Sequence, residues 1–88
     1  MNHTSFIKQR FTRDSLTPIT LGNIIYYPVD GEIRIPSTHG DFVITLVTEN
    51  LLRKDWYYEI IFGDKRFIHV GYDDLVDALV VLTAQYNK

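Results

Sequence analysis

The sequence predicts an α+β fold in which an antiparallel sheet of about five strands is followed by one amphipathic helix. Two observations support this prediction. Between residues 19 and 71, short runs rich in β-branched and aromatic residues alternate with glycine, proline and aspartate turns. After residue 73, apolar residues recur every three or four positions, which is the spacing of one helix face. A chain of 88 residues holds a single domain with one modest core.

Residues 1–17 are predicted to form a basic arm, and residues 18–88 a single α+β domain. The apolar residues of the arm follow neither a helical nor a strand period. Pro18 marks the boundary, because proline lacks a donor and disfavours helix in the residue before it. The arm has a local net charge of +2 and the domain one of -4. Either the arm is flexible or it folds back onto the sheet.

The strands are predicted to follow one another as a meander of hairpins. The first, Ile19–Tyr27, is expected to contain a bulge at Gly22, because an isolated glycine in a strand pattern indicates one. Pro28 to Gly31 supplies a turn, after which Glu32–Ile35 returns as the second strand of a hairpin. The remaining predicted strands are Asp41–Thr48, Trp56–Phe62 and Arg66–Gly71.

The helix is predicted over Asp74–Tyr86, with Asp73 as its N-cap. Its apolar stripe consists of Leu75, Leu79, Leu82 and Tyr86. About fifteen residues give a rod of roughly 22 Å, which is close to the width of four or five strands ~4.8 Å apart. One helix is therefore expected to cover one face of the sheet.

The third and fourth strands carry apolar residues on both faces, although a one-sided sheet should alternate apolar with polar. The face turned away from the helix is expected to carry Val43, Val47, Tyr57 and Ile61. Each large apolar side chain left in water forgoes about 1.5–3 kcal/mol, so several of them rival a small domain's whole stability. Three arrangements would cover this face: the sheet curls towards a small barrel, the arm folds back onto it, or another chain docks there.

No catalytic, cofactor or metal site is predicted. Ser37 to Asp41 contains nucleophile, base and carboxylate residue types, but triads are assembled from separate parts of a fold and a turn explains the segment better. His69 is expected to be a structural residue in mid-strand. The acidic residues at the helix start suit the helix dipole. Cysteine is absent, which excludes thiolate sites. The chain is therefore not expected to be an enzyme.

The first functional hypothesis is a small protein-binding module, because tyrosine and tryptophan combine a large apolar area with a polar group. The predicted partner-binding residues are Tyr26, Tyr27, Trp56, Tyr57 and Tyr58. Such a module would be an inhibitor, adaptor or immunity-type accessory protein of the kind carried by mobile elements. It would act by occluding a protein partner, as a monomer or as a homodimer.

The alternative hypothesis is binding of single-stranded nucleic acid, with bases stacked on the sheet aromatics and phosphates held by cations. The cations for this role are Arg10, Arg13, Arg34, Arg53, Lys54 and Arg66. A curved antiparallel sheet followed by a C-terminal helix resembles, in element order, the coactivator-type single-stranded-DNA-binding proteins. That resemblance implies a dimerising helix, while the present chain has an extra predicted strand and lacks their strongly basic sheet.

Composition points to a soluble cytoplasmic protein without a membrane or small-molecule partner. Apolar residues at 45% and charged residues at 23% fall in the globular range and argue against general disorder. No run approaches the ~20 apolar residues that a membrane span requires, and no early apolar run follows a basic start.

Overall fold

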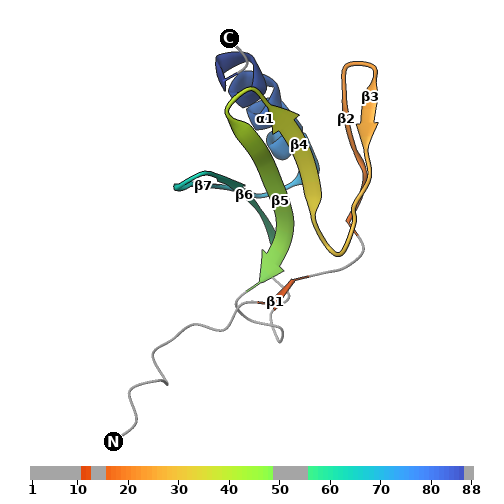
Figure 1. Cartoon of the computed structure of the whole chain (residues 1–88). Coiled ribbons are helices and arrows are strands. Elements are labelled where there is room, and N and C mark those ends of the chain that lie inside the picture. The colour runs from red at the N-terminus through yellow and green to blue at the C-terminus, as the bar shows by residue number, and fades with distance from the viewer. Residues whose placement is uncertain (1–10, 13–15, 49–55, 87–88) are drawn as a thin grey trace, which may run out of the picture.

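A computed structural model describes residues 11–12, 16–48 and 56–86 of the chain (Figure 1). Its elements, in order, are β1 (Phe11–Thr12), β2 (Ile19–Leu21), β3 (Ile24–Tyr26), β4 (Ile33–Ser37), β5 (Gly40–Thr48), β6 (Tyr57–Phe62), β7 (Lys65–His69) and α1 (Tyr72–Tyr86). All pairings are antiparallel, and the helix comes last. The predicted α+β class is therefore confirmed.

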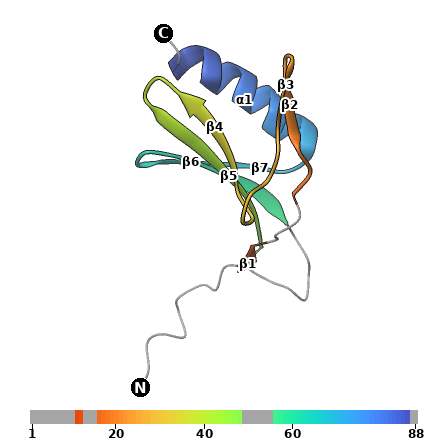
Figure 2. The same ribbon diagram turned by 45° about the vertical axis from the view of Figure 1, so that its right-hand side comes forward.

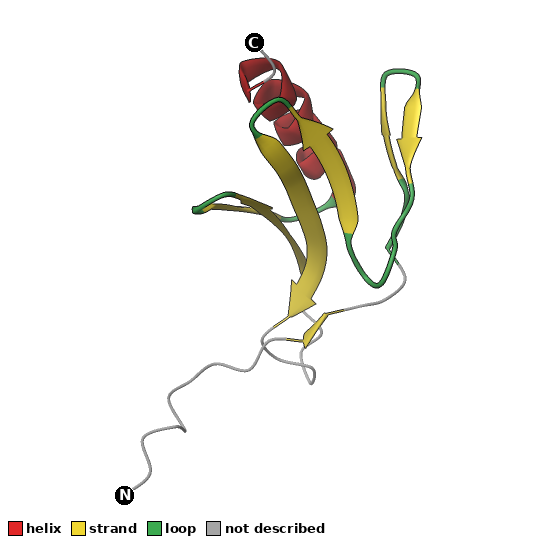
Figure 3. Cartoon of the chain, in the orientation of Figure 1, coloured by secondary structure: helices red, strands yellow, loops and turns green. Residues whose placement is uncertain are grey.

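The main sheet is built on β5, the longest strand (Figure 3). One edge of β5 pairs with β6, which in turn pairs with β7. The other edge is shared by β4, opposite the first half of β5, and β1, opposite Val47 and Thr48. The strands β4 to β7 thus form the meander expected from the sequence, while β2 and β3 form a separate two-stranded sheet.

The segment Ile19–Tyr27 is a hairpin and not one bulged strand, so this part of the prediction was wrong. Leu21 lies opposite Ile24 across a two-residue turn, and Gly22 occupies the first turn position with φ +60°. A positive φ at this position, without one at Asn23, is the type II′ pattern, and it favours glycine because a side chain is strained there. The single five-stranded meander is accordingly not confirmed.

The predicted turn before β4 is present, but the predicted hairpin around it is not. Asp30 and Gly31 both have positive φ, 54° and 78°, which is the type I′ pattern. The N–H of Val29 donates to the carbonyl of Glu32 at 2.8 Å, and the reverse bond is 3.1 Å. Pairing stops at this isolated bridge, so the turn joins two sheets instead of two strands of one sheet.

The helix lies across one face of the main sheet, beside the β2–β3 hairpin (Figure 2). Leu75 and Leu79, from the predicted apolar stripe, are fully buried. The core that they complete also contains Leu16, Ile19, Ile33, Ile35, Phe42, Ile44, Ile60 and Phe62. The helix begins at Tyr72, so Asp73 lies in its first turn and is not the N-cap. No helix of the described residues is long and apolar enough to cross a membrane.

Tyr72 ties the start of the helix to the hairpin. Its hydroxyl donates to the carbonyl of Pro18 at 3.0 Å and accepts from the N–H of Thr20 at 3.4 Å. The first of these bonds has ordinary length and the second is long. Pro18 directly precedes β2 and Thr20 lies within it, so the start of the helix is bonded to the backbone of the hairpin.

Tyr86 ties the end of the helix to both hairpin tips of the main sheet. Its ring centroid lies 4.8 Å from that of Phe62, which stacks on Phe42 at 4.2 Å. Its hydroxyl accepts from Lys65 Nζ at 2.9 Å, and its carbonyl accepts from Thr38 Oγ1 at 2.9 Å. One residue therefore joins the β4–β5 turn, the β6–β7 hairpin and the helix.

The sheet face opposite the helix is less exposed than the sequence predicted. Val47 is fully buried, and Val43, Tyr57 and Ile61 are half-buried. Glu59, on the same face, is also buried and pairs with Arg66. Among the described residues, one exposed large apolar side chain in the strands lies on this face: Ile68 of β7, which the register places opposite Glu59. The others lie on the hairpin, the following turn, the end of β7 and the helix: Ile24, Ile25, Tyr27, Val29, Val70, Val80 and Val81.

Candidate interaction surface

The connection from β3 to β4 forms a shallow hollow of about 410 Å³, which we call the turn hollow. It is lined by Tyr27, Val29, Asp30, Glu32 and Arg34. Tyr27 is 64% exposed and Val29 is 70% exposed, so two apolar side chains stand in water beside three charged ones. The type I′ turn and its two backbone bonds fix the backbone between Val29 and Glu32.

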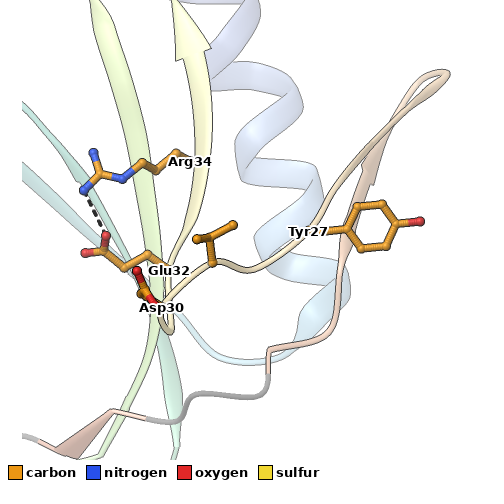
Figure 4. Close-up of a pocket in the computed structure, with 5 residues that line it drawn as sticks. Tyr27, Asp30, Glu32 and Arg34 are labelled. Carbon is orange, nitrogen blue, oxygen red and sulfur yellow. Dashed lines mark hydrogen bonds and ion pairs between the residues drawn. The ribbon is translucent and has the colours of Figure 1, made fainter.

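The side chains of the turn hollow do not converge on one point. Figure 4 shows the ring of Tyr27 on one side and the paired Arg34 and Glu32 on the other, with Asp30 at the turn. Arg34 Nη2 lies 2.9 Å from Glu32 Oε1, an exposed ion pair of the kind that contributes about 0–1 kcal/mol. A splayed set of this sort suits contact with a broad surface better than enclosure of a small molecule.

The residue types that resembled a catalytic set are used to close a turn. The hydroxyl of Ser37 donates to the carbonyl of Gly40 at 2.6 Å and accepts from the N–H of His39 at 3.2 Å. These bonds shape the turn between β4 and β5, as the sequence indicated. Within residues 11–12, 16–48 and 56–86, no three histidine or acidic side chains gather where they could hold a metal ion.

The five predicted aromatic residues are divided between two sheets. Tyr26 and Tyr58 pack against the core, and burial together with the neighbouring Tyr72 raises the pKa of Tyr58. Trp56, directly before β6, and Tyr57, its first residue, are half-buried. Tyr27, which directly follows β3, is the most exposed of the set. The structure therefore brings together Tyr26 and Tyr27 as one group and the β6 residues as another.

Two of the six predicted phosphate-binding cations can be placed. The others, Arg10, Arg13, Arg53 and Lys54, lie outside the described residues. The strand register puts Arg34 and Arg66 at the two ends of one row across β4 to β7, on the face away from the helix. Arg34 pairs with Glu32, and Arg66 pairs with the buried Glu59. Carboxylates thus neutralise both charges.

Sequence reasoning missed the exposed aliphatic residues Ile24, Ile25 and Val29. The signal was the dipeptide Gly22-Asn23, which between two apolar runs is a turn signature for a two-residue hairpin. A second signal was charge: no charged residue occurs from Ser15 to Val29. Together they mark an uncharged hairpin that stands outside the main sheet.

Comparisons with known proteins assign no family to this surface. No protein-family model, curated protein or solved structure matches the chain. The proposals that follow therefore rest on the residues and geometry of the chain itself.

Proposed function

We propose that this chain is a small non-enzymatic protein-binding module that occludes a protein partner through the turn hollow. The observation that carries the proposal is the exposure of Tyr27 and Val29 beside the charged residues Asp30, Glu32 and Arg34. Protein interfaces combine an apolar centre with a polar rim, and tyrosine is enriched among the residues that contribute most binding energy. Tyr27 is the proposed anchor, and it belongs to the set predicted from the sequence.

Preorganisation of the turn hollow supports this proposal. A flexible loop loses conformational entropy when a partner orders it, whereas a turn already closed by hydrogen bonds loses less. Val29 and Glu32 form such a closed turn, with bonds of 2.8 and 3.1 Å. Tyr27 adds a large side chain with few rotatable bonds. The proposed setting is the cytoplasm, in the manner of the accessory proteins of mobile elements.

The nucleic-acid alternative has weaker support. A phosphate-binding site needs cations that are available to replace counterions along the backbone. Arg34 and Arg66 each already bind a carboxylate, and phosphate would have to displace it. The aromatic residues near this sheet face are also half-buried, with Tyr57 the main example, which limits base stacking.

The test is affinity capture with the full-length chain in nuclease-treated host lysate. Tyr27→Ala should reduce recovery of a specifically retained protein, with binding weakened about tenfold or more, because truncating a central anchor costs ~1–4 kcal/mol. Val81→Ala is the matched control, since Val81 is a similarly exposed apolar residue on the helix. Equal binding by both variants would contradict the proposal. Salt-sensitive binding of a fluorescent single-stranded oligonucleotide would favour the alternative.

A further inference from the structure

The two backbone edges of the β2–β3 hairpin have different surroundings: one lies against the helix and the other does not. Across its two-residue turn, Leu21 and Ile24 exchange hydrogen bonds, so the next pair, Thr20 and Ile25, directs its N–H and C=O groups outwards. The N–H of Thr20 meets the hydroxyl of Tyr72, which places that edge against the helix. The corresponding groups of Ile25 point to the opposite edge, away from the helix.

The Ile25 edge is open among the described residues. There β3 pairs with no strand other than β2, and no hydrogen bond to the outward groups of Ile25 occurs within that part of the chain. Figure 1 shows β3 on the outer side of β2 near the hairpin tip. Towards its C-terminal end β3 comes near β4, but the two form no strand pair. An open strand edge is a template for pairing with another strand.

This edge lacks the features by which proteins usually prevent pairing. Charged side chains, and lysine above all, commonly protect exposed edges. Here the fifteen residues from Ser15 to Val29 include no charge. Ile24 is 55% exposed and Ile25 is 49% exposed, and β-branched side chains favour the extended conformation. Pro28 limits the open edge at its C-terminal end.

We infer that a second copy of this chain pairs with the β3 edge, so that two hairpins form one antiparallel four-stranded ribbon about a two-fold axis. With Ile25 on the axis, its N–H donates to the carbonyl of Ile25 in the second copy, and the reverse bond is identical. Ile24 then lies opposite Tyr26 of that copy. The contact joins two uncharged strands, so it creates neither like-charge repulsion nor a buried unpaired charge.

The other hairpin edge limits the assembly to a dimer. An isologous contact uses the same patch on both copies and closes on itself. Growth beyond two copies would need the β2 edge, where Tyr72 already occupies the outward N–H of Thr20. Pairing through the β3 edge is therefore expected to give a dimer and no larger assembly. The turn hollow begins at Tyr27, the residue after Tyr26 of this contact. The two proposals are tested by different variants and measurements, so a failed dimer test leaves the proposed function to its own experiment.

The test measures the molar mass of the full chain over a wide range of concentration by sedimentation equilibrium. Wild type should change reversibly between monomer and dimer. Ile25→Lys should weaken dimerisation about tenfold or more, because two like charges would face each other at the axis. Val81→Lys, which adds the same charge at another exposed valine, should leave the dissociation constant unchanged. A monomer at every concentration, or a dimer insensitive to Ile25→Lys, would overturn the inference.

A second measurement uses wild type alone, so it remains valid if the Ile25→Lys variant does not fold. In wild type, hydrogen exchange at the Ile25 amide should slow by several-fold as the protein concentration rises, because dimerisation removes that N–H from water. Exchange at Thr20 should not depend on concentration, since its N–H already faces Tyr72. Exchange at Ile25 that is independent of concentration would overturn the inference. A foreign strand at the same edge would appear as slowed exchange only after another protein is added, which also overturns the second-copy assignment.

Discussion

Replacing Tyr86 by alanine tests whether one residue fastens the helix end to the sheet. The change removes a ring whose centroid lies 4.8 Å from Phe62 and 6.2 Å from Phe42. It also removes the hydroxyl that accepts from Lys65. The carbonyl that accepts from Thr38 belongs to the backbone and is retained. The variant therefore isolates the side chain of Tyr86 from the path of the backbone.

The expected cost of Tyr86→Ala is about 2–4 kcal/mol. Fully burying a large apolar side chain contributes about 1.5–3 kcal/mol, so this half-buried ring contributes roughly half of that. Each aromatic pair adds ~0.5–1.5 kcal/mol. Because small domains are stable by about 5–15 kcal/mol, the loss would be a large part of the total. Tyr86→Phe keeps the ring and should retain nearly all of the stabilisation.

The assay is urea unfolding, followed by fluorescence of Trp56 and by far-ultraviolet circular dichroism. Trp56 is the single tryptophan of the chain and directly precedes β6, outside the helix. Coincident transitions from the two probes would show that helix and sheet unfold together. If Tyr86→Ala and Tyr86→Phe were equally stable, packing of the Tyr86 ring would not be what holds the helix end.

Two further predictions concern titratable groups. Burial and Tyr72 raise the pKa of Tyr58 above its ordinary value of 10.0, so its contribution to stability is complete below that pH and is lost as pH rises through the folded-state pKa. The urea concentration at the unfolding midpoint should therefore fall as pH rises above about 10. It should fall less steeply in Tyr58→Phe than in wild type or in the exposed control Tyr27→Phe. The same slope of midpoint against pH in all three proteins would contradict this prediction. Glu59→Gln should cost about 1–2 kcal/mol in urea unfolding, because it breaks the ion pair between a buried carboxylate and Arg66, which remains partly hydrated; unchanged stability would mean that the ion pair contributes nothing.

The long elements were predictable because their signals repeat over many residues. In α1, Leu75 and Leu79 recur at helical spacing, and both are fully buried. The β4 to β7 meander was likewise visible as apolar runs between turns, with each strand near its expected range. Even there, the first residue of the helix was placed two positions late, since the N-cap pattern of Asp73 competed with the true start at Tyr72.

The short hairpin was missed because a glycine inside an apolar run has two meanings. Gly22 suits both a bulge and the first position of a type II′ turn, and a window of nine residues does not separate them. The choice affects function directly. A single strand in the main sheet would have hidden the backbone of Ile25, whereas the separate hairpin leaves it at an edge.

By itself, the sequence determined the class of the fold, the helix and its buried stripe, and the long strands, because side-chain periodicity is a local property. Only the tertiary structure decided that β2 and β3 leave the main sheet, that Tyr72 and Tyr86 fasten the two ends of the helix, and that four exposed apolar residues, Ile24, Ile25, Tyr27 and Val29, lie on the hairpin and turn while most of the second sheet face is covered. The physical reason is that burial and edge exposure depend on which segments pack together across the chain, and no local pattern records that pairing.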